Sequence, residues 1–285
     1  MTRTVRALHA PVREDIGDLV TRRPLPGQTA ANIDPFLFLN HHGPQTYAPH
    51  NNGLPFGPHP HRGFETVTFI VEGELAHHDS TGHSSVIGPG GVQWMTAGSG
   101  IVHAEVSPRD FKERGGPMEI LQLWVNLPAR LKFTPPEYQG LQAADIPAIA
   151  LDGATLNLIA GEFNGQRGPV KSITGHLVTT VSLKPGARVT LSAPHDRSVF
   201  FYVVRGAVRA SEVEVPQWRL AEFNGDGNSI NVEAMQDSLL LFGHGGPINE
   251  PIFAHGPFVM NTRDEIVQAI QDYQAGKFGA EPVIA

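Results

Sequence analysis

Residues 57–105 read GPHPHRGFETVTFIVEGELAHHDSTGHSSVIGPGGVQWMTAGSGIVHAE, and this stretch decides the fold. It opens with two histidines one residue apart, His59 and His61, and it closes with His103 and Glu105 at the same spacing. Side chains at positions i and i+2 of an extended strand point to the same face. Two such strands facing one another would therefore bring three imidazoles and one carboxylate together.

This donor set predicts a transition-metal site. Imidazole and carboxylate ligands in that ratio suit Fe(II), Mn(II), Ni(II), Cu(II) or Zn(II), whereas Ca(II) and Mg(II) prefer an all-oxygen shell. Four protein ligands on a six-coordinate ion leave two positions open, which indicates a reactive or ligand-binding site. A metal that only contributes folding energy is the alternative that the sequence favours less.

Between the two pairs, the sequence is typical of antiparallel strands joined by tight turns. Residues 64–71 are rich in β-branched and aromatic side chains, as strands are. Turn clusters containing glycine follow at 71–74, 79–82 and 88–91. Short strands punctuated in this way predict an all-β sandwich or barrel, with both pairs of candidate ligands on strands.

Several literal runs resemble known families. The order of an HxH pair, a strand, a glycine turn, a PGG turn, another strand and a further histidine resembles the cupin double-stranded β-barrel. More narrowly, the chain resembles the pirin family in HPHRGFETV at 59–67, QWMTAG at 93–98, HAE at 103–105, LQLWVNL at 121–127, NEP at 249–251 and HGPFVMNT at 255–262. The resemblance implies a bicupin, an all-β protein of two cupin-type double-stranded β-barrels. It also implies iron in the first barrel, held by His59, His61, His103 and Glu105.

The identity of the carboxylate ligand is a separate question. Most cupins place it four residues after the second histidine, where this chain has Glu65. Strand parity does not decide between Glu65 and Glu105, because residues 59, 61 and 65 share parity and so do 103 and 105. The pirin resemblance points to Glu105. Glu65 remains the alternative, and is otherwise expected to line the pocket or to orient a histidine.

The resemblance implies two functions that need the same open iron site. One is ring-opening 2,3-dioxygenation of flavonols such as quercetin, with Glu105 as the general base that takes the substrate's hydroxyl proton. The other is a non-enzymatic regulator that binds a transcription factor or metabolic enzyme and switches with the oxidation state of iron. We prefer the dioxygenase. Its small aromatic substrate would need apolar walls, for which the nearby candidates are Phe56, Phe64, Trp94 and Met95.

The other histidines of the first half are expected to lie outside the site. His41 and His42 precede Gly43 in what looks like a loop, and adjacent residues of a strand point to opposite faces. Three further histidines flank a turn and are expected at the surface or at the pocket rim: His77, His78 and His83.

The second half repeats the pattern without the ligands. The strand 199–204 before Arg205-Gly206 is similar to 67–71 before Gly73, which predicts a second barrel. Where the first half has His59-Pro60-His61, the second has His195-Asp196-Arg197, and a guanidinium has no lone pair for a metal. We therefore expect no metal there.

A proline-rich connection places the domain boundary near residue 135, giving domains 1–135 and 136–285. The second domain is expected to end in a helix. Thr262 and Glu265 form a capping box, and Gly276 ends the helix. Its apolar stripe is formed by Ile266, Ala269, Ile270 and Tyr273.

Composition excludes several classes of function. The 21 basic and 28 acidic residues give a net charge of −7, which disfavours direct nucleic-acid binding through phosphate contacts. With no cysteine, disulfides, thiol catalysis and cysteine-ligated metals are excluded. No signal-like apolar core and no membrane-spanning run is present, which predicts a cytoplasmic protein without a membrane partner.

Overall fold

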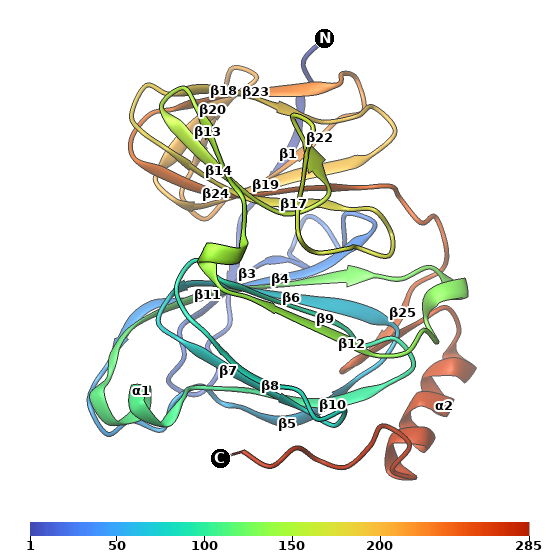
Figure 1. Ribbon diagram of the computed structural model, residues 1–285. Coiled ribbons are helices and arrows are strands. Elements are labelled where there is room, and N and C mark those ends of the chain that lie inside the picture. The colour runs from blue at the N-terminus through green and yellow to red at the C-terminus, as the bar shows by residue number, and fades with distance from the viewer. Residues whose placement is uncertain (285) are drawn as a thin grey trace. The chain divides into compact units, whose positions relative to one another are not determined.

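The computed structural model describes residues 1–284, which form two compact units that each contain a β-barrel (Figure 1). We call the barrel that carries His59 the first barrel and the other the second barrel. The predicted all-β class is confirmed. Among the described residues, no helix combines the length and the apolar character needed to cross a membrane.

The first barrel consists of two antiparallel sheets. Its larger sheet contains, in spatial order, β12 (Glu137–Leu141), β9 (Val92–Thr96), β6 (Phe64–Glu72), β11 (Gly116–Asn126), β4 (Phe36–Tyr47), β3 (Thr21–Leu25) and β2 (Val12–Arg13). Its smaller sheet contains β5 (Phe56–His61), β10 (Ile101–Val106), β7 (Leu75–Asp79) and β8 (Ser84–Ile87). The short helix α1 (Arg109–Arg114) connects β10 to β11.

The second barrel repeats this order, which confirms the predicted duplication. Its larger sheet contains β1 (Val5–His9), β22 (Leu220–Phe223), β19 (Ser198–Arg205), β24 (Ser238–Gly245), β17 (Leu177–Leu183), β14 (Ala154–Ala160) and β13 (Ala148–Leu151). Its smaller sheet contains β18 (Arg188–Ser192), β23 (Ser229–Ala234), β20 (Ala207–Ala210) and β21 (Val213–Pro216). Strand β19 lies between β22 and β24 just as β6 lies between β9 and β11, and β18-β23-β20-β21 matches β5-β10-β7-β8. The short hairpin β15 (Glu162–Phe163) and β16 (Gln166–Arg167) follows β14.

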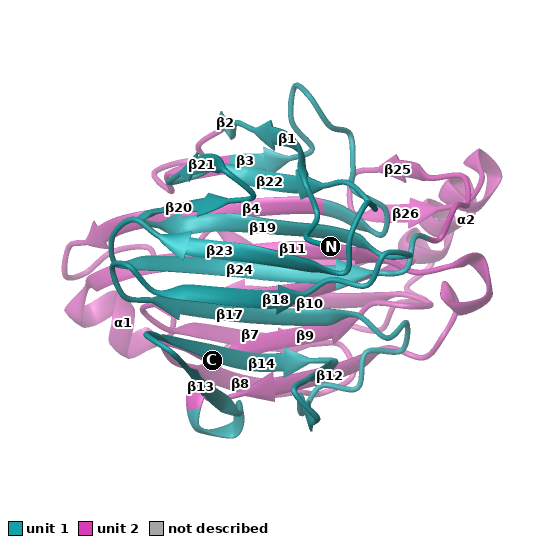
Figure 2. Cartoon of the chain, turned by 90° about the horizontal axis from the view of Figure 1, so that it is seen from above, with its two compact units in different colours: residues 1–12, 23–37, 144–247 teal, residues 13–22, 38–143, 248–285 magenta. Residues whose placement is uncertain are grey.

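The compact units do not follow a single cut in the sequence (Figure 2). The unit with the second barrel comprises Met1–Val12, Arg23–Leu37 and Ala144–Pro247, and the unit with the first barrel comprises Arg13–Arg22, Phe38–Ala143 and Ile248–Ala285. The predicted ranges 1–135 and 136–285 were contiguous, so they differ from these units at both ends of the chain.

The two chain ends explain this difference. At the N-terminus, β1 pairs with β22, and the buried Arg3 guanidinium donates to the carbonyl oxygens of Ala193 and Gly227. At the C-terminus, β25 (Phe253–His255), β26 (Phe258–Met260) and α2 (Arg263–Gln274) belong to the unit of the first barrel. Each end therefore completes a barrel that lies far from it in the sequence.

Helix α2 has the predicted start and stripe. The Thr262 side chain accepts a hydrogen bond from the Glu265 amide, and the Glu265 carboxylate accepts one from the Thr262 amide, so the capping box is complete. Ile266 and Ala269 pack in a cluster with Val102 of β10. The C-terminal helix is thus docked on the first barrel by its apolar face.

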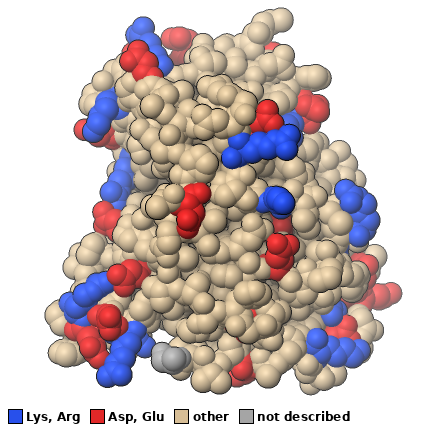
Figure 3. Space-filling model, in the orientation of Figure 1, with Lys and Arg blue, Asp and Glu red and all other residues tan. Residues whose placement is uncertain are grey.

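Charged side chains of both signs are interspersed over the face of the molecule that Figure 3 shows. The interior of the second barrel is apolar, with Leu158, Phe201, Ile230 and Phe242 among the core side chains. The first barrel differs because polar side chains are buried beside its apolar core, and these define the candidate site.

Candidate metal centre

Three histidines meet inside the first barrel. His59 and His61 lie on β5, His103 lies on the neighbouring β10, and the backbone register pairs His103 with His59. The three residues offer ligand nitrogens that all lie within 4.8 Å of one another. Their ring centroids are separated by 4.4 to 4.9 Å. The alternation of strand residues thus places these side chains on one face, as the HxH spacing predicted.

Hydrogen bonds fix two of the imidazoles. His59 Nδ1 lies 2.7 Å from the Gly57 carbonyl oxygen, and His61 Nδ1 lies 3.3 Å from that of Pro257. A carbonyl oxygen only accepts, so Nδ1 carries the proton in each ring and Nε2 keeps its lone pair. This is the usual arrangement of a metal-binding histidine, in which a backbone carbonyl sets the tautomer.

His103 has no such partner. Its side chain is 1% exposed, and neither ring nitrogen has a hydrogen-bond partner among residues 1–284. A buried polar nitrogen without a partner is costly, and it is rare in native proteins. An ion that accepts the His103 lone pair would remove this cost, so the residues present fit a metal.

The protonation states of the histidines fit a metal as well. Burial lowers the pKa of His59, and it lowers the pKa values of His61 and His103 well below their usual range. The positive charge that any one of them would carry lowers the pKa of its neighbours further. All three are therefore neutral at neutral pH, which is the form that binds a metal.

Glu105 is buried beside the triad but is not a member of the 4.8 Å group, which contains histidines alone. Its Oε1 accepts a hydrogen bond from Thr68 Oγ1 and its Oε2 accepts one from Gln122 Nε2, both at 2.7 Å. The Gln122 amide is in turn held by Trp124, whose Nε1 donates to Gln122 Oε1 at 3.3 Å. Burial raises the pKa of Glu105 to about 7, and the two hydrogen bonds oppose this rise.

Glu65 faces away from the histidines. Its Oε1 accepts hydrogen bonds from Trp94 Nε1 at 3.0 Å and Thr96 Oγ1 at 2.7 Å. Thr68, three residues further along β6, contacts Glu105, so Glu65 lies on the opposite face of the strand. The expectation that Glu65 lines the pocket or orients a histidine is therefore wrong.

Residues 61 and 65 have the same parity in the sequence, but a break between two strands at Gly63 separates them. Gly63 has φ of +89°, and β5 ends before it while β6 begins after it. A Cβ at this position would lie 2.0 Å from the Val259 carbonyl oxygen, so only glycine fits. The break reverses the alternation of side chains, and residues 61 and 65 no longer share a face.

The aromatic wall differs in part from the expected one. Phe64 lies beside His61, with ring centroids 5.0 Å apart, as expected. Trp94 is hydrogen-bonded to Glu65 on the far face of β6, so it is not a wall of the site. Instead Trp124 packs against His61 at 5.3 Å and Phe64 at 4.4 Å, and Phe38 stacks on Trp124 at 4.6 Å.

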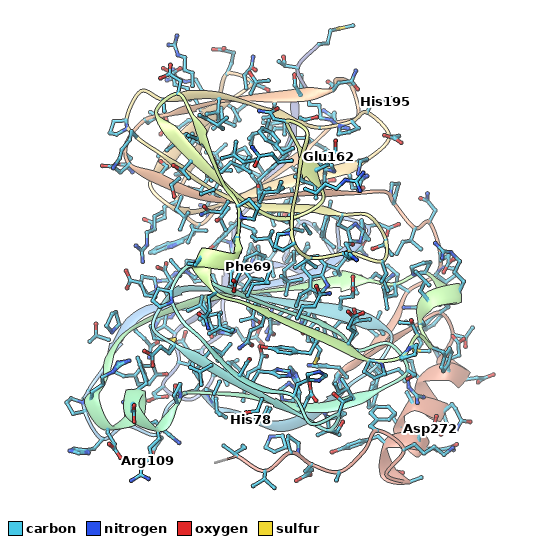
Figure 4. The ribbon with its side chains drawn as sticks, viewed as in Figure 1. Phe69, His78, Arg109, Glu162, His195 and Asp272 are labelled. Carbon is cyan, nitrogen blue, oxygen red and sulfur yellow. The ribbon has the colours of Figure 1, made fainter. Side chains whose placement is uncertain are left out.

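Sequence reasoning also missed His77. It was expected at the surface or pocket rim, but it is buried, and its ring centroid lies 5.4 Å from that of His103. Its Nε2 lies 2.9 Å from Asp79 Oδ2, and its ring stacks on Tyr138 at 3.9 Å. The period-two alternation of Leu75, His77 and Asp79 was the signal that could have found it. His78, labelled in Figure 4, is the intervening and less buried residue of β7.

His41 and His42 lie in β4 and not in a loop. His41 Nε2 lies 2.9 Å from Glu119 Oε1, and His42 Nδ1 lies 2.8 Å from Thr21 Oγ1. In the second barrel, His195 is exposed, and His195-Asp196-Arg197 lies in the loop between β18 and β19. The strand that matches β5 is β18, so this triplet does not occupy the place of His59-Pro60-His61, as the sequence comparison had suggested.

Comparisons with known proteins add to this geometry. The family model described as Pirin matches residues 18–125, and the one described as Pirin C-terminal cupin domain matches residues 178–279. A Pseudomonas aeruginosa protein named "Putative quercetin 2,3-dioxygenase" is 43% identical over 249 residues, covering 87% of each chain. Human Pirin is 37% identical over 286 residues, covering 98% of this chain and 94% of its own.

Solved structures show the same fold. A crystal structure of quercetin 2,3-dioxygenase from Acinetobacter baumannii superposes with a TM-score of 0.92 at 37% identity, covering 98% of this chain and 99% of that one. A nickel(II) complex of the bacterial pirin YhhW from Escherichia coli superposes with a TM-score of 0.67 at 22% identity, covering 85% and 99% of the two chains. The second likeness concerns the fold alone.

Proposed function

The chain belongs to the pirin family, and from this premise we propose that its first barrel is a metal-dependent dioxygenase site acting on flavonols such as quercetin. The observation that carries the proposal is the set of three buried or half-buried imidazoles whose nitrogens lie within 4.8 Å of one another, with the ring nitrogens of His103 lacking a hydrogen-bond partner among the described residues. The relatives named as quercetin 2,3-dioxygenases support the substrate class.

The proposed ligands are His59, His61, His103 and Glu105. The donor set suits Fe(II), Mn(II), Ni(II), Cu(II) and Zn(II), and the pirin resemblance is the reason for preferring Fe(II). Glu105 lies two residues from His103 on the same strand, and each of its oxygens has a second lone pair besides the one that accepts from Thr68 or Gln122. These two hydrogen bonds hold the carboxylate in one orientation.

Held by these residues, a metal of this kind would supply Lewis acidity toward a substrate hydroxyl. Glu105 is the proposed general base. Burial raises its pKa to about 7, above the usual range of a carboxyl, and this greater basicity favours transfer of a proton from a substrate hydroxyl to Glu105. The Trp124–Gln122 hydrogen bond keeps the amide donor aimed at Glu105, so the carboxylate stays in position as it gains and loses a proton.

The aromatic side chains beside His61 are the proposed contact surface for the substrate. Phe38 and Trp124 are stacked, and Phe64 packs against Trp124 with the two rings tilted by 35°, so the wall beside His61 is aromatic and apolar. A planar aromatic substrate packs well on such a surface. The same wall limits the access of water to the reacting atoms.

The test is oxygen consumption with quercetin by the iron-loaded full-length protein. We expect turnover in the wild type and its loss in His61→Ala, because the variant lacks a ligand imidazole. His195→Ala, which removes an exposed histidine of the second barrel, is the matched control and should turn over as the wild type does. Elemental analysis of each variant reports metal content independently of activity.

Two results would contradict the proposal. Equal turnover by His61→Ala and wild type would show that the triad is not the site. No turnover with any of the five metals, together with capture of a protein partner that depends on the oxidation state of iron, would favour the redox-sensing regulator.

A further inference from the structure

The second barrel contains a cavity of its own. It has a volume of about 540 Å³, within the range of small-molecule sites, roughly 300–1,000 Å³. The ionisable side chains that line it are Arg167, Lys171, Arg197, His176, His244 and Glu162. Three permanent cations thus share the cavity with one carboxylate (Glu162 is labelled in Figure 4).

Arg197 is the most informative of these residues. It lies in the loop between β18 and β19, directly before the first residue of β19. Its Nη2 donates to the carbonyl oxygens of Gly175 and His244, which fixes the orientation of the guanidinium plane.

The charge of Arg197 is nevertheless not balanced locally. Its Nε is buried without a hydrogen-bond partner among residues 1–284, and no described carboxylate lies within the 4.0 Å of an ion pair. Burial lowers its pKa, and the charge of the adjacent Asp196 opposes this. A partly buried guanidinium without a carboxylate partner is costly, and an oxyanion is the ligand that its planar fork matches.

Two histidines that line the same cavity each have a ring nitrogen without a hydrogen-bond partner among the described residues. His176 and His244 are 1% and 6% exposed, and the Nδ1 atom of each has no partner among the described residues. His176 Nε2 lies 2.5 Å from Thr174 Oγ1. Burial lowers the pKa of both histidines to about 3, so they are neutral and can each donate one N–H.

The remaining cations lie further out. Lys171 is exposed, and no ion pair is formed by it within residues 1–284. Arg167 is paired with Glu162 at 3.2 Å, and both side chains are mostly exposed. The cavity lining therefore includes a half-buried guanidinium and an exposed ammonium that form no ion pair within residues 1–284, which is unsuited to a metal cation and suited to an anion.

We propose that this cavity binds a small organic oxyanion, a carboxylate or a phosphate monoester, with Arg197 as the anchor of its charged group. The proposal does not depend on the dioxygenase function of the first barrel.

Calorimetric titration of the full-length protein at neutral pH and low salt tests the proposal, with inorganic phosphate and succinate as separate probes. We expect saturable binding of one equivalent of at least one probe, and the stronger probe tells the two ligand chemistries apart. Arg197→Gln should weaken binding about tenfold or more, because a hydrogen bond to a charged group is lost. Arg197→Lys should weaken it less, because the charge remains without the planar fork.

Arg188→Gln is the matched control, because it removes the same charge from an exposed pair with Glu233 on the same barrel. Its affinity should stay within about twofold of the wild type. If Arg197→Gln does not fold, Lys171→Gln replaces an exposed side chain and should still weaken binding several-fold.

Three outcomes would overturn the proposal. The first is no saturable binding of either probe at millimolar concentration. The second is an equal loss in Arg197→Gln and Arg188→Gln, which would indicate unspecific attraction to surface charge. The third is loss of binding in His61→Ala, which would place the anion in the first barrel.

Discussion

At the scale of single residues, the ligand candidates were predictable but their surroundings were not. The HxH spacing was enough to bring His59 and His61 to one face, because alternation along a strand is a local property. The position of Glu65 was not predictable, because it depends on a strand break at Gly63 that a distant carbonyl, that of Val259, imposes. His77 was missed because its burial depends on Tyr138, which lies on a strand far along the chain.

Gly63→Ala should therefore be strongly destabilising. Its Cβ would lie 2.0 Å from the Val259 carbonyl oxygen, and its φ of +89° is unfavourable for alanine, so we expect a loss of about 2 kcal/mol or more in the free energy of unfolding. Chemical denaturation measures this. Gly82→Ala is the control, since its φ is +95° but no atom lies within 4 Å of the added Cβ, and its loss should be about 1 kcal/mol. Equal losses in the two variants would show that the contact with Val259 is unimportant.

At the scale of elements, the sequence was sufficient to predict those helices and strands whose limits depend on neighbouring residues in the chain. The capping box and apolar stripe of α2 predicted its start and its buried face, and the turn glycines predicted the strands around the site. The sequence pattern did not predict which barrel α2 covers, because an apolar stripe does not determine the surface against which the helix packs. In the structure, the segment before α2 is hydrogen-bonded to Arg62, the residue that directly follows β5. The Arg62 amide donates to the Pro257 carbonyl oxygen at 3.3 Å, and the Val259 amide donates to the Arg62 carbonyl oxygen at 3.1 Å.

Removal of the cap should loosen α2 without unfolding the barrel. In Thr262→Ala the amide of Glu265 loses its side-chain acceptor, so we expect the free energy of local opening of α2 to fall by about 1 kcal/mol. Hydrogen exchange of the α2 amides measures this opening. Thr262→Ser keeps the hydroxyl and should exchange like the wild type. Unchanged exchange in Thr262→Ala would mean that packing alone determines the stability of the helix.

At the scale of the whole molecule, repetition along the chain predicted two barrels of one kind, and the shared strand order confirms it. The loss of the HxH motif predicted that the two barrels differ in chemistry, and the structure shows neutral buried histidines beside a guanidinium in the second. Their burial has a consequence for stability that involves the entire fold, because histidines are protonated freely only when the chain unfolds.

The free energy of unfolding should therefore decrease as the pH falls from about 6.5 towards 3. The pKa of His176 is about 3 in the folded protein, and that of an unfolded histidine is about 6.5. Between these values the unfolded chain binds more protons, so acid favours unfolding, by up to about 1.4 kcal/mol per pH unit for one such histidine.

Denaturation at a series of pH values between 4.5 and 6.5 checks this expectation. His176→Gln should show a slope that is shallower by about one proton than that of the wild type. His195→Gln, which changes an exposed histidine of the same barrel, should keep the wild-type slope. Identical slopes for His176→Gln and wild type would show that His176 takes up protons in the folded state.

The segment around Pro257, which completes the first barrel, also determines when the histidine triad can become ordered during synthesis of the chain. The carbonyl of Pro257, which holds His61, and the backbone of Val259, which closes over Gly63, are synthesised after all three histidines, 196 residues separating Pro257 from His61. A nascent chain that already displays all three histidines still lacks the carbonyl group that orients His61. The triad is therefore complete only after the segment around Pro257 has been synthesised, and a metal delivered before then would meet an incompletely ordered site.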